Sequence, residues 1–470
     1  MLLTTTFAIL LALAFAAFGR AFCRPRQISL ETLNLWFLTG AGVSAGILFP
    51  LTIAFQGKAV VIVLALLAAS LLIAAFRGAA RTRGSERVGV PDDTRDGLPD
   101  LRDPVSLLLA ALVACGVALF LFLDYRFGFM FDGFQIWAVK AKLLYVRGDL
   151  SPLPFTFAHD HLPRVLRWYP PLVPMYGALV SRAAAPFRAE EFRFELIKPV
   201  FGVFFLSLVC STYFCALRLG SRRAALLAAA LVSFVPVLIS YGAGGYADMP
   251  LAAYVAAIAC SAASARDRSS PNSPLYWLIA SLLMVKAEGA ILAAIAMAAL
   301  AGPVVVESLR TGRGAWRPLL GAIPIAGFAV LRAGYYGWLG GAEKTYQLHT
   351  RTDLIVGLRR IPETLRLCFG EAVAPSNWGI LWPAFAVALA VLWLSVYPAA
   401  PRILGAATAI CAACYAGIFL FTQWPLKIHI EQGYPRLLSH LAPAAAVVIA
   451  VALCGNPPRG EPSPGRPPAG

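Results

Sequence analysis

The chain has 470 residues, of which 59% are hydrophobic and only 14% are charged. Soluble domains are about half apolar and about a quarter charged, so this composition excludes a water-soluble fold. The formal net charge of +16 comes with arginines in short loops between apolar blocks. That pattern indicates membrane topology under the positive-inside rule and argues against a nucleic-acid partner.

The apolar blocks predict an all-α polytopic membrane protein with about 13 transmembrane helices, since runs of about 18 apolar residues can cross a bilayer. Residues 1–19 lack the positively charged start of a secretory signal, so we expect a first membrane helix with its N-terminus outside. In chain order, the predicted spans are 3–19, 34–55, 59–77, 104–123, 196–216, 224–240, 250–265, 275–285, 288–303, 318–338, 380–397, 403–422 and 437–454.

Three regions follow from this pattern. Residues 1–103 contain the first membrane helices and a polar cytoplasmic linker rich in Gly, Pro and Asp. Residues 104–454 form the main membrane module. The tail, 455–470, is rich in Pro and Gly and is predicted to be a disordered cytoplasmic segment.

Residues 170–184 are apolar, but the segment is short and starts with two prolines. Treated as a span, it would place Arg222 and Arg223 outside and Asp248 inside, against the positive-inside rule. We therefore predict an interfacial or re-entrant helix on the exoplasmic side, with a transmembrane span as the alternative. The exoplasmic segments available for chemistry are then 124–195, 339–379 and 423–436, with the short turns around Asp248 and Lys286.

Two aspartates are predicted at the exoplasmic ends of spans. Asp132 stands between aromatic residues, where a partly dry carboxylate is suited to general-base catalysis. Capping of the helix that starts after Gly133 is the structural alternative. Asp248, two residues before Pro250, has the features of an N-cap residue. It is expected on the same face as Asp132, so capping and function are compatible there.

Ionisable groups interrupt the later apolar blocks. Lys286 and Glu288 would be costly at membrane depth, where such groups are functional or paired. Lys286 either binds a phosphate as a point charge or pairs with a carboxylate. Arg436, at the start of the last span, can donate a fork of hydrogen bonds to phosphate oxygens, and a snorkelling arginine is the alternative.

The remaining polar candidates are expected to contact substrate. His159-Asp160-His161 offers metal ligands, but no further ligand stands at a definable spacing, so the sequence requires no metal and a substrate contact or solvated loop is favoured. Arg167 and Tyr169 belong to a stretch that is typical of an interfacial anchor. The predicted substrate-binding residues are Glu288, His159, Asp160, Arg167, Tyr169, His429 and Tyr434.

The order of the motifs resembles the C-type glycosyltransferases, the GT-C superfamily. The early aspartate is followed by W-x-x-K-A-K-x-L-Y-x-x-G, Y-P-P-L, Y-A-D, K-x-E-G and R-x-L-x-H-L-x-P. These motifs lie at Trp137 to Gly148, Tyr169 to Leu172, Tyr246 to Asp248, Lys286 to Gly289 and Arg436 to Pro443. The resemblance covers the module 104–454, and within the superfamily it is to bacterial relatives of protein O-mannosyltransferases and of the aminoarabinose transferase acting on lipid A.

The resemblance implies a multi-pass enzyme of a bacterial-type inner membrane with an exoplasmic active site. Its donor would be a polyprenyl-phosphate-linked sugar, transferred with inversion to a hydroxyl of a lipid, glycan or protein acceptor. By motif position, Asp132 and Asp248 would be the catalytic aspartates, and Lys286 and Arg436 would bind the donor phosphate. Many relatives carry two adjacent acids in the first loop, whereas Gly133 follows Asp132 here, which leaves dependence on a divalent metal open.

A transporter or flippase of a lipid-linked anionic glycan is the main alternative, because the same cations would bind a phosphate in transit. Such transporters place charges near the bilayer midplane in broken helices and are often built from repeats. Here the charges gather at one face and no internal repeat is visible, so the sequence favours the enzyme. A non-catalytic assembly or anchoring protein is a third reading, and it predicts no convergent charged cavity.

Overall fold

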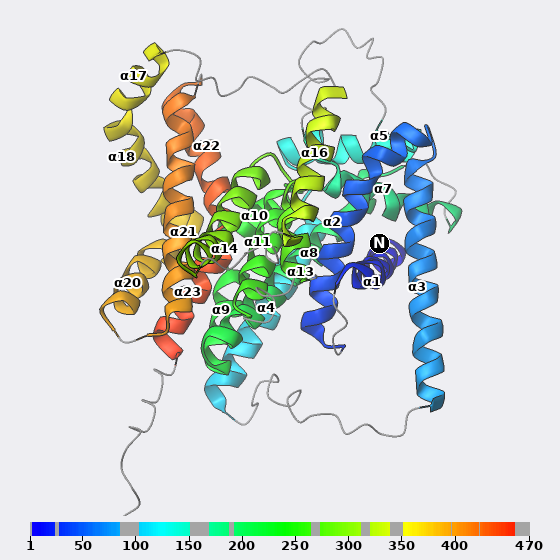
Figure 1. The fold of residues 1–470 in the computed structure, drawn as a ribbon, viewed down its shortest axis with the longest axis horizontal. Coiled ribbons are helices and arrows are strands. Elements are labelled where there is room, and N and C mark those ends of the chain that lie inside the picture. Colours follow the sequence, from blue (N-terminus) through cyan, green and yellow to red (C-terminus); the bar gives the residue numbers. More distant parts are fainter. Residues whose placement is uncertain are drawn as a thin grey trace, which may run out of the picture.

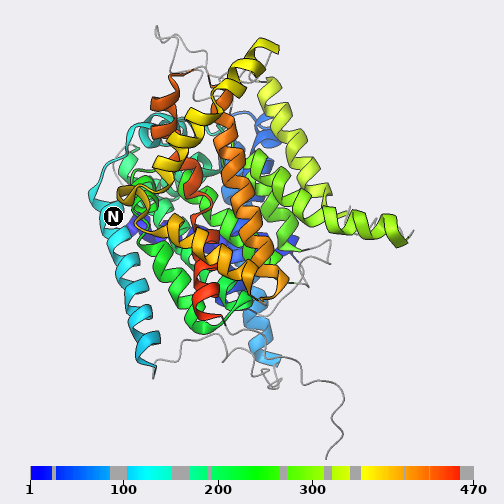
Figure 2. The ribbon, with the colours of Figure 1, turned by 90° about the vertical axis from the view of Figure 1, so that its left-hand side faces the viewer.

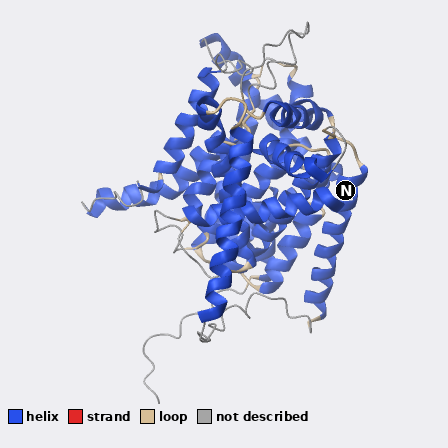
Figure 3. Cartoon of the chain, turned by 90° about the vertical axis from the view of Figure 1, so that its right-hand side faces the viewer, coloured by secondary structure: helices blue, strands red, loops and turns tan. Residues whose placement is uncertain are grey.

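The computed structural model describes residues 2–23, 28–84, 103–150, 169–187, 192–264, 273–311, 320–338, 351–395, 397–422 and 424–455. Within these ranges the chain is helical, with short turns between helices and no β-strand (Figure 3). The predicted all-α class is confirmed. Helices suit apolar segments of this kind because a helix satisfies its own backbone hydrogen bonds in lipid.

The helices of the first half are α1 (Leu2–Gly19), η1 (Arg20–Phe22), α2 (Leu30–Ala54), α3 (Ala59–Gly84), α4 (Pro104–Arg126), η3 (Gly133–Ala138), α5 (Val139–Arg147), α7 (Leu172–Ala184), η4 (Ala185–Phe187), η5 (Phe194–Ile197), α8 (Lys198–Leu219) and α9 (Arg222–Ser233). Those of the second half are α10 (Pro236–Ala243), α11 (Asp248–Ala262), α13 (Pro274–Leu282), α14 (Gly289–Thr311), α16 (Ile323–Trp338), α17 (Arg351–Arg359), α18 (Ile361–Ala372), α19 (Pro375–Trp378), α20 (Leu381–Leu394), α21 (Ala399–Ile418), η6 (Phe419–Phe421), α22 (Leu426–Ser439) and α23 (Ala442–Cys454).

Five described helical segments are long and apolar enough to cross a membrane, which makes the chain a multi-pass membrane protein. They are Leu3–Phe22, Leu30–Ala54, Pro104–Arg126, Phe194–Leu219 and Ala399–Phe421. Two bent pairs, α9 with α10 and α22 with α23, raise the number to seven if each pair is one span. The predicted number of about 13 is not confirmed, because other predicted spans form shorter apolar helices such as α11 and α20.

Both bent pairs break where a proline opens the second helix, with a bend of 56°. α10 begins at Pro236, and Pro443 is the second residue of α23. A proline has no N–H to continue the preceding helix but fits the first turn of a new one. In the second pair the break leaves His440 between two helices, where its side chain can enter the core.

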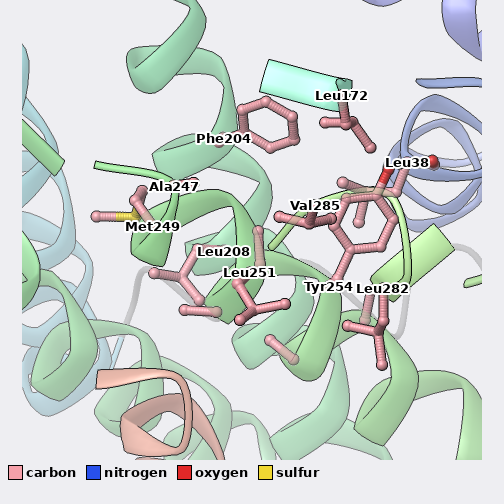
Figure 4. Close-up of a cluster of buried hydrophobic side chains, with 14 of the residues drawn as sticks. Leu38, Leu172, Phe204, Leu208, Ala247, Met249, Leu251, Tyr254, Leu282 and Val285 are labelled. Carbon is pink, nitrogen blue, oxygen red and sulfur yellow. Dashed lines mark hydrogen bonds between the residues drawn. The ribbon is translucent and has the colours of Figure 1, made fainter. Parts of the chain in front are cut away.

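The core surrounds α8 and α11 and includes the N-terminal helices. Tyr254 of α11 donates a hydrogen bond to the carbonyl of Leu38 in α2, at 2.6 Å, among buried side chains that include Leu251 and Leu282 (Figure 4). Tyr176 of α7 similarly donates to the carbonyl of Ala8 in α1, at 2.6 Å. These hydrogen bonds and the buried apolar side chains around them therefore join α1 and α2 to the rest of the bundle.

The two ends of the bundle carry different elements. Figure 1 places α5, α7 and α17 at one end, and the C-terminal ends of α3 and α23 at the other. Figure 2 shows that α14 leaves the bundle sideways instead of running along α21. α7 has 13 residues, fewer than a full span needs, is mostly buried and lies beside α5. Its interfacial or re-entrant placement stays a prediction.

Candidate active site

Asp248 lies at the centre of a buried ionic cluster. It is the first residue of α11, its side chain is 1% exposed, and its Oδ1 lies 2.7 Å from Lys286 Nζ and 2.9 Å from His440 Nε2. The predicted N-cap role is wrong: Ala247 holds the N-cap position, and the Asp248 carboxylate is occupied by basic side chains from other elements. A carboxylate at the first helical residue is nonetheless favoured by the helix dipole.

Arg436 of α22 joins the two predicted catalytic aspartates. Its Nη1 lies 2.5 Å from Asp132 Oδ2, while its Nε and Nη2 lie 3.4 Å and 3.3 Å from Asp248 Oδ2. The structure thus brings together three residues that the sequence placed in separate segments. The side chains of Arg436 and Asp132 are each 20% exposed, so this pair forms the more accessible part of the cluster.

Asp132 holds the position before η3 but does not cap it through its side chain, so the structural alternative for this residue is also wrong. The segment after it, η3, is a π-helix, and the Asp132 side chain makes no capping hydrogen bond to it. Its carboxylate instead faces Arg436. Single π-helical turns are rare in proteins as a whole, and many of those known lie at functional sites. This one connects Asp132, the catalytic candidate, directly to α5.

Gly133 explains why a second acid is missing beside Asp132. A Cβ atom at this position would lie 2.0 Å from the carbonyl oxygen of Gly244. The same carbonyl accepts a hydrogen bond from the backbone N–H of Met130 at 2.9 Å. The Gly244 backbone, in the turn that precedes α11, therefore packs directly on the loop that carries Asp132, and no side chain at position 133 fits between them.

A second ion pair supports the turn that precedes α11. Lys198, at the start of α8, donates to the carbonyl of Ala243 and lies 3.3 Å from Asp124 near the end of α4. Both side chains are almost fully buried. Gly245, which follows, has φ +80°, a left-handed conformation that glycine adopts without strain. Backbone and ion pair together position the turn from which Asp248 begins α11.

Lys286 and Glu288 occupy the turn between α13 and α14. Lys286 is 2% exposed, and its Nζ lies 3.2 Å from Glu288 Oε1 in addition to its contact with Asp248. The structural alternative for Lys286, a carboxylate pair, is therefore realised, and the charge of this lysine is compensated twice. Burial opposes ionisation of Glu288, but the charge of Lys286 outweighs it, so the pKa of Glu288 is lowered.

Aromatic rings surround the Arg436 guanidinium. Its Cζ lies 4.7 Å from the ring centre of Tyr246 and 6.0 Å from that of Tyr241. Burial, together with the negative charge of Asp132, raises the pKa of Tyr246, so this phenol stays neutral. Cation–π contact with two rings restricts the guanidinium to one orientation.

Two residues of the cluster were not among the predicted site residues, although the R-x-L-x-H-L-x-P motif contains one of them, His440. His440 and Tyr415 are fully buried, and Tyr415 Oη lies 3.2 Å from His440 Nδ1. His440 follows Arg436 by four residues, so helical spacing offered a signal that both share one face. For Tyr415, which lies in the apolar helix α21, no local signal exists.

Tyr169 belongs to a separate group rather than to the ionic cluster. Its ring contacts Trp137 at 5.1 Å in an edge-to-face arrangement, and its carbonyl accepts a hydrogen bond from Lys140 Nζ. Lys140 also donates to Tyr335 Oη at 3.2 Å. Burial lowers the pKa of Lys140 to about 7.

His429 and Tyr434 of α22 pack against the end of α21. The His429 Nδ1 lies 2.5 Å from Thr422 Oγ1, and its ring centre is 5.0 Å from that of Phe419. Tyr434 lies 6.0 Å from the same Phe419 ring. Their role in substrate binding stays a prediction.

The predicted residues His159, Asp160 and Arg167 lie outside the described residues. In the ranges that the structure does describe, no group of three or more His, Cys, Asp or Glu side chains is arranged to hold a metal ion.

No family model matches the chain, and no curated protein matches it. Solved structures to which it is similar include two crystal structures of ArnT from Cupriavidus metallidurans, one bound to undecaprenyl phosphate and one in the apo state. Each match has 16% identity and covers 74% of this chain and 59% of the ArnT chain, with TM-scores of 0.47 and 0.45. This chain thus spans about three-fifths of the length of those chains.

Proposed function

We propose that this protein is a membrane glycosyltransferase that moves a sugar from a polyprenyl-phosphate donor to an acceptor hydroxyl, with inversion at the anomeric carbon. The observation that carries the proposal is the bridge that Arg436 makes between Asp132 and Asp248. A partly exposed acid, a cation able to bind phosphate and two tyrosine rings meet in a single place. Those are the groups that transfer from a sugar phosphate requires.

Asp132 is the general base. Of the two aspartates it is the accessible one, whereas Asp248 is closed off by three basic side chains. Asp132 takes the proton of the acceptor hydroxyl as that oxygen forms a bond to the anomeric carbon. The bond from this carbon to the phosphate oxygen breaks at the same time, and the polyprenyl phosphate leaves with the electron pair.

Arg436 binds the phosphate and stabilises the negative charge that develops on the leaving oxygen. A guanidinium suits this task because its planar fork of N–H donors matches phosphate oxygens. Lys286 acts at longer range: it is buried behind Asp248, and its charge offsets the two carboxylates that it contacts. We therefore assign the direct phosphate contact to Arg436 and an electrostatic role to Lys286.

The bridge also sets an order of binding. In the absence of substrate, Nη1 of Arg436 occupies Asp132 Oδ2 at 2.5 Å, so this oxygen is not available to accept a proton. A donor phosphate competes with Asp132 for the guanidinium and so frees the carboxylate. Donor binding therefore favours the form of Asp132 in which both carboxylate oxygens can accept a proton.

The active site faces the exoplasmic side of a bacterial-type inner membrane. The supporting observation concerns α4, whose 23 residues cover about 34 Å and so about one bilayer core. Asp103 at its start pairs with Arg223 at 3.0 Å, while Asp132 follows its other end. Under the positive-inside rule, the end with Arg223 is cytoplasmic and the end with Asp132 is exoplasmic.

One observation favours the transport alternative. The bent pair α22 and α23 places His440 at a helix break, and transporters of anionic substrates use broken helices in this way. The two functions predict different products. A transporter moves labelled lipid-linked sugar across proteoliposomes without consuming it, whereas the enzyme releases free polyprenyl phosphate.

The proposal is tested with purified protein in proteoliposomes containing a polyprenyl-phosphate hexose and a glycolipid acceptor. We expect release of polyprenyl phosphate and formation of a glycosylated product, both detected by mass spectrometry. Comparison of glycolipids and glycoproteins in a deletion strain identifies the acceptor class. Movement of intact donor across the bilayer, with no product formed, would replace the glycosyltransferase by the transporter.

A further inference from the structure

Three buried side chains form a series of contacts that leads away from the reactive face of the cluster. Tyr415 of α21, His440 at the break between α22 and α23, and Asp248 of α11 are each fully buried. Tyr415 Oη lies 3.2 Å from His440 Nδ1, and His440 Nε2 lies 2.9 Å from Asp248 Oδ1. This series of contacts therefore ends at the Asp248 carboxylate, which also contacts Arg436.

The Asp248 carboxylate has no capacity left for substrate. Its Oδ1 accepts from Lys286 and lies against His440, and its Oδ2 accepts from two nitrogens of Arg436. A carboxylate offers about four lone-pair positions in all. All of them face protein donors, so Asp248 has no position from which to take a proton from an acceptor hydroxyl.

We propose that His440 and Tyr415 are positioning residues that act, through Asp248, on the orientation of Arg436. Of the two aspartates, Asp132 then takes the proton of the acceptor, and Asp248 serves to anchor the cation. This inference rests on the proposed function and deepens it, because it separates the residues that touch substrate from those that orient them.

The helix geometry supports the assignment. His440 follows Arg436 by one helical turn, so the end of α22 and the residue after it supply both the cation and a group that fixes the partner of that cation. The bend of 56° after α22 directs His440 into the core. Ser439 Oγ donates to the Arg436 carbonyl at 2.6 Å, which further holds the last turn of α22.

Tyr415 selects the form of the imidazole. When its hydroxyl donates to Nδ1, the neutral ring carries its proton on Nε2 and donates that proton to Asp248. This tautomer gives Asp248 a third donor without a further buried charge. Loss of the phenol leaves the tautomer unselected, so its effect on Arg436 is weaker than loss of the imidazole itself.

The simpler reading is that His440 only fills space in the core. Both readings predict a less stable protein for His440→Leu, so stability alone does not separate them. They differ in whether the loss of activity depends on Arg436. A positioning residue acts only while Arg436 is present, whereas a space-filling residue acts independently of it.

The test is a double-mutant cycle on kcat/KM for sugar transfer in proteoliposomes. We expect His440→Leu to lower kcat/KM by about 100-fold, the order of loss that a misplaced reacting group produces. His440→Gln, which keeps an amide N–H near the place of Nε2, should recover most of it. In an Arg436→Lys background, His440→Leu should cause no further loss. An equal fold-loss in both backgrounds, or normal kcat/KM in His440→Leu, would overturn the inference.

Tyr415→Phe should cause a smaller loss than His440→Leu. Its matched control is Tyr397→Phe, which removes a phenol that donates to the carbonyls of Ala452 and Gly455, at the far end of α23. This control should leave kcat/KM unchanged. A loss in Tyr397→Phe equal to that in Tyr415→Phe would assign both effects to general packing.

A second measurement needs no enzymatic activity. An experimental structure of His440→Leu in lipid nanodiscs shows whether Arg436 Nη1 still contacts Asp132. A displaced guanidinium supports the inference, and an unmoved one rejects it. If the guanidinium is displaced while the wild-type protein transfers no sugar, the proposed function fails and the positioning relation stands.

Discussion

Arg436 lies 304 residues from Asp132 along the chain and 2.5 Å from it in the fold. The same guanidinium contacts Asp248, and two tyrosine rings enclose it. Under the proposed function, a donor phosphate competes with the two carboxylates for this guanidinium, so its binding requires a rearrangement of the cluster.

Asp132→Asn should abolish sugar transfer. The amide keeps the shape of the side chain but accepts no proton, so we expect kcat to fall by about 100- to 10,000-fold, the range for a lost general base. The measurement is release of polyprenyl phosphate in proteoliposomes. Glu431→Gln is the control, because Glu431 lies on α22 and is exposed beside Lys427. Full activity of Asp132→Asn would remove this residue as the base.

Arg436→Lys should lose most of its sugar-transfer activity although it keeps the positive charge. An ammonium is a point charge and does not replace a planar fork that bridges two carboxylates and contacts two rings. We expect kcat/KM to fall by at least about 100-fold, the usual loss for one donor that stabilises developing charge. The control is Arg359→Lys, at an exposed position of α17. Wild-type kinetics for Arg436→Lys would contradict the phosphate contact.

Gly133→Ala should disturb the site without adding a charge. The new methyl group would lie 2.0 Å from the Gly244 carbonyl oxygen, so the two loops must separate. We expect a lower Tm and reduced sugar transfer. Gly128→Ala is the matched control in the same loop, since a Cβ there meets no atom within 4 Å. Equal Tm values for the two variants would show that the close contact is not present.

The stability of the protein should rise with pH above neutrality because of Lys140. Its pKa is about 7 in the fold, against about 10.4 in an unfolded chain. Between these values the unfolded chain binds a proton that the folded chain lacks, so the free energy of unfolding increases with pH. Below about pH 7 both forms are charged and this contribution stays at its minimum.

The measurement is Tm between pH 7 and pH 10 in detergent, a window set by these pKa values. Lys140→Met should be more stable than wild type at pH 7, with a flatter dependence on pH. Lys142→Met is the control, because Lys142 lies on the same helix but is exposed. An unchanged slope in Lys140→Met would show that another group titrates.

Much of the fold and part of the site were predictable from local sequence. Apolar blocks gave helices close to their predicted positions, because bilayer thickness and backbone hydrogen bonding leave few choices. The meeting of Asp132, Asp248, Lys286 and Arg436 followed from placing their segments at one membrane face. Their roles in catalysis remain predictions.

The details of the cluster depended on contacts between distant segments. Asp248 stands two residues before Pro250 and so has the local pattern of a cap, yet Lys286 and His440 contact its carboxylate. The proximity of Tyr415 to His440 depends on how α21 packs against α22. Local sequence carries no information on that packing.

Two tyrosine hydroxyls impose a constraint on any shorter version of this protein. Tyr176 and Tyr254 donate their protons to main-chain oxygens of Ala8 and Leu38, which belong to α1 and α2. A chain that began at residue 104 would remove both of these carbonyl acceptors. The Tyr176 phenol would then lack its bond to Ala8 in an apolar environment, at a cost of several kcal/mol, whereas the Tyr254 phenol would keep its interaction with the Ser281 side chain. Natural relatives without the two leading helices are therefore expected to have phenylalanine at the place of Tyr176.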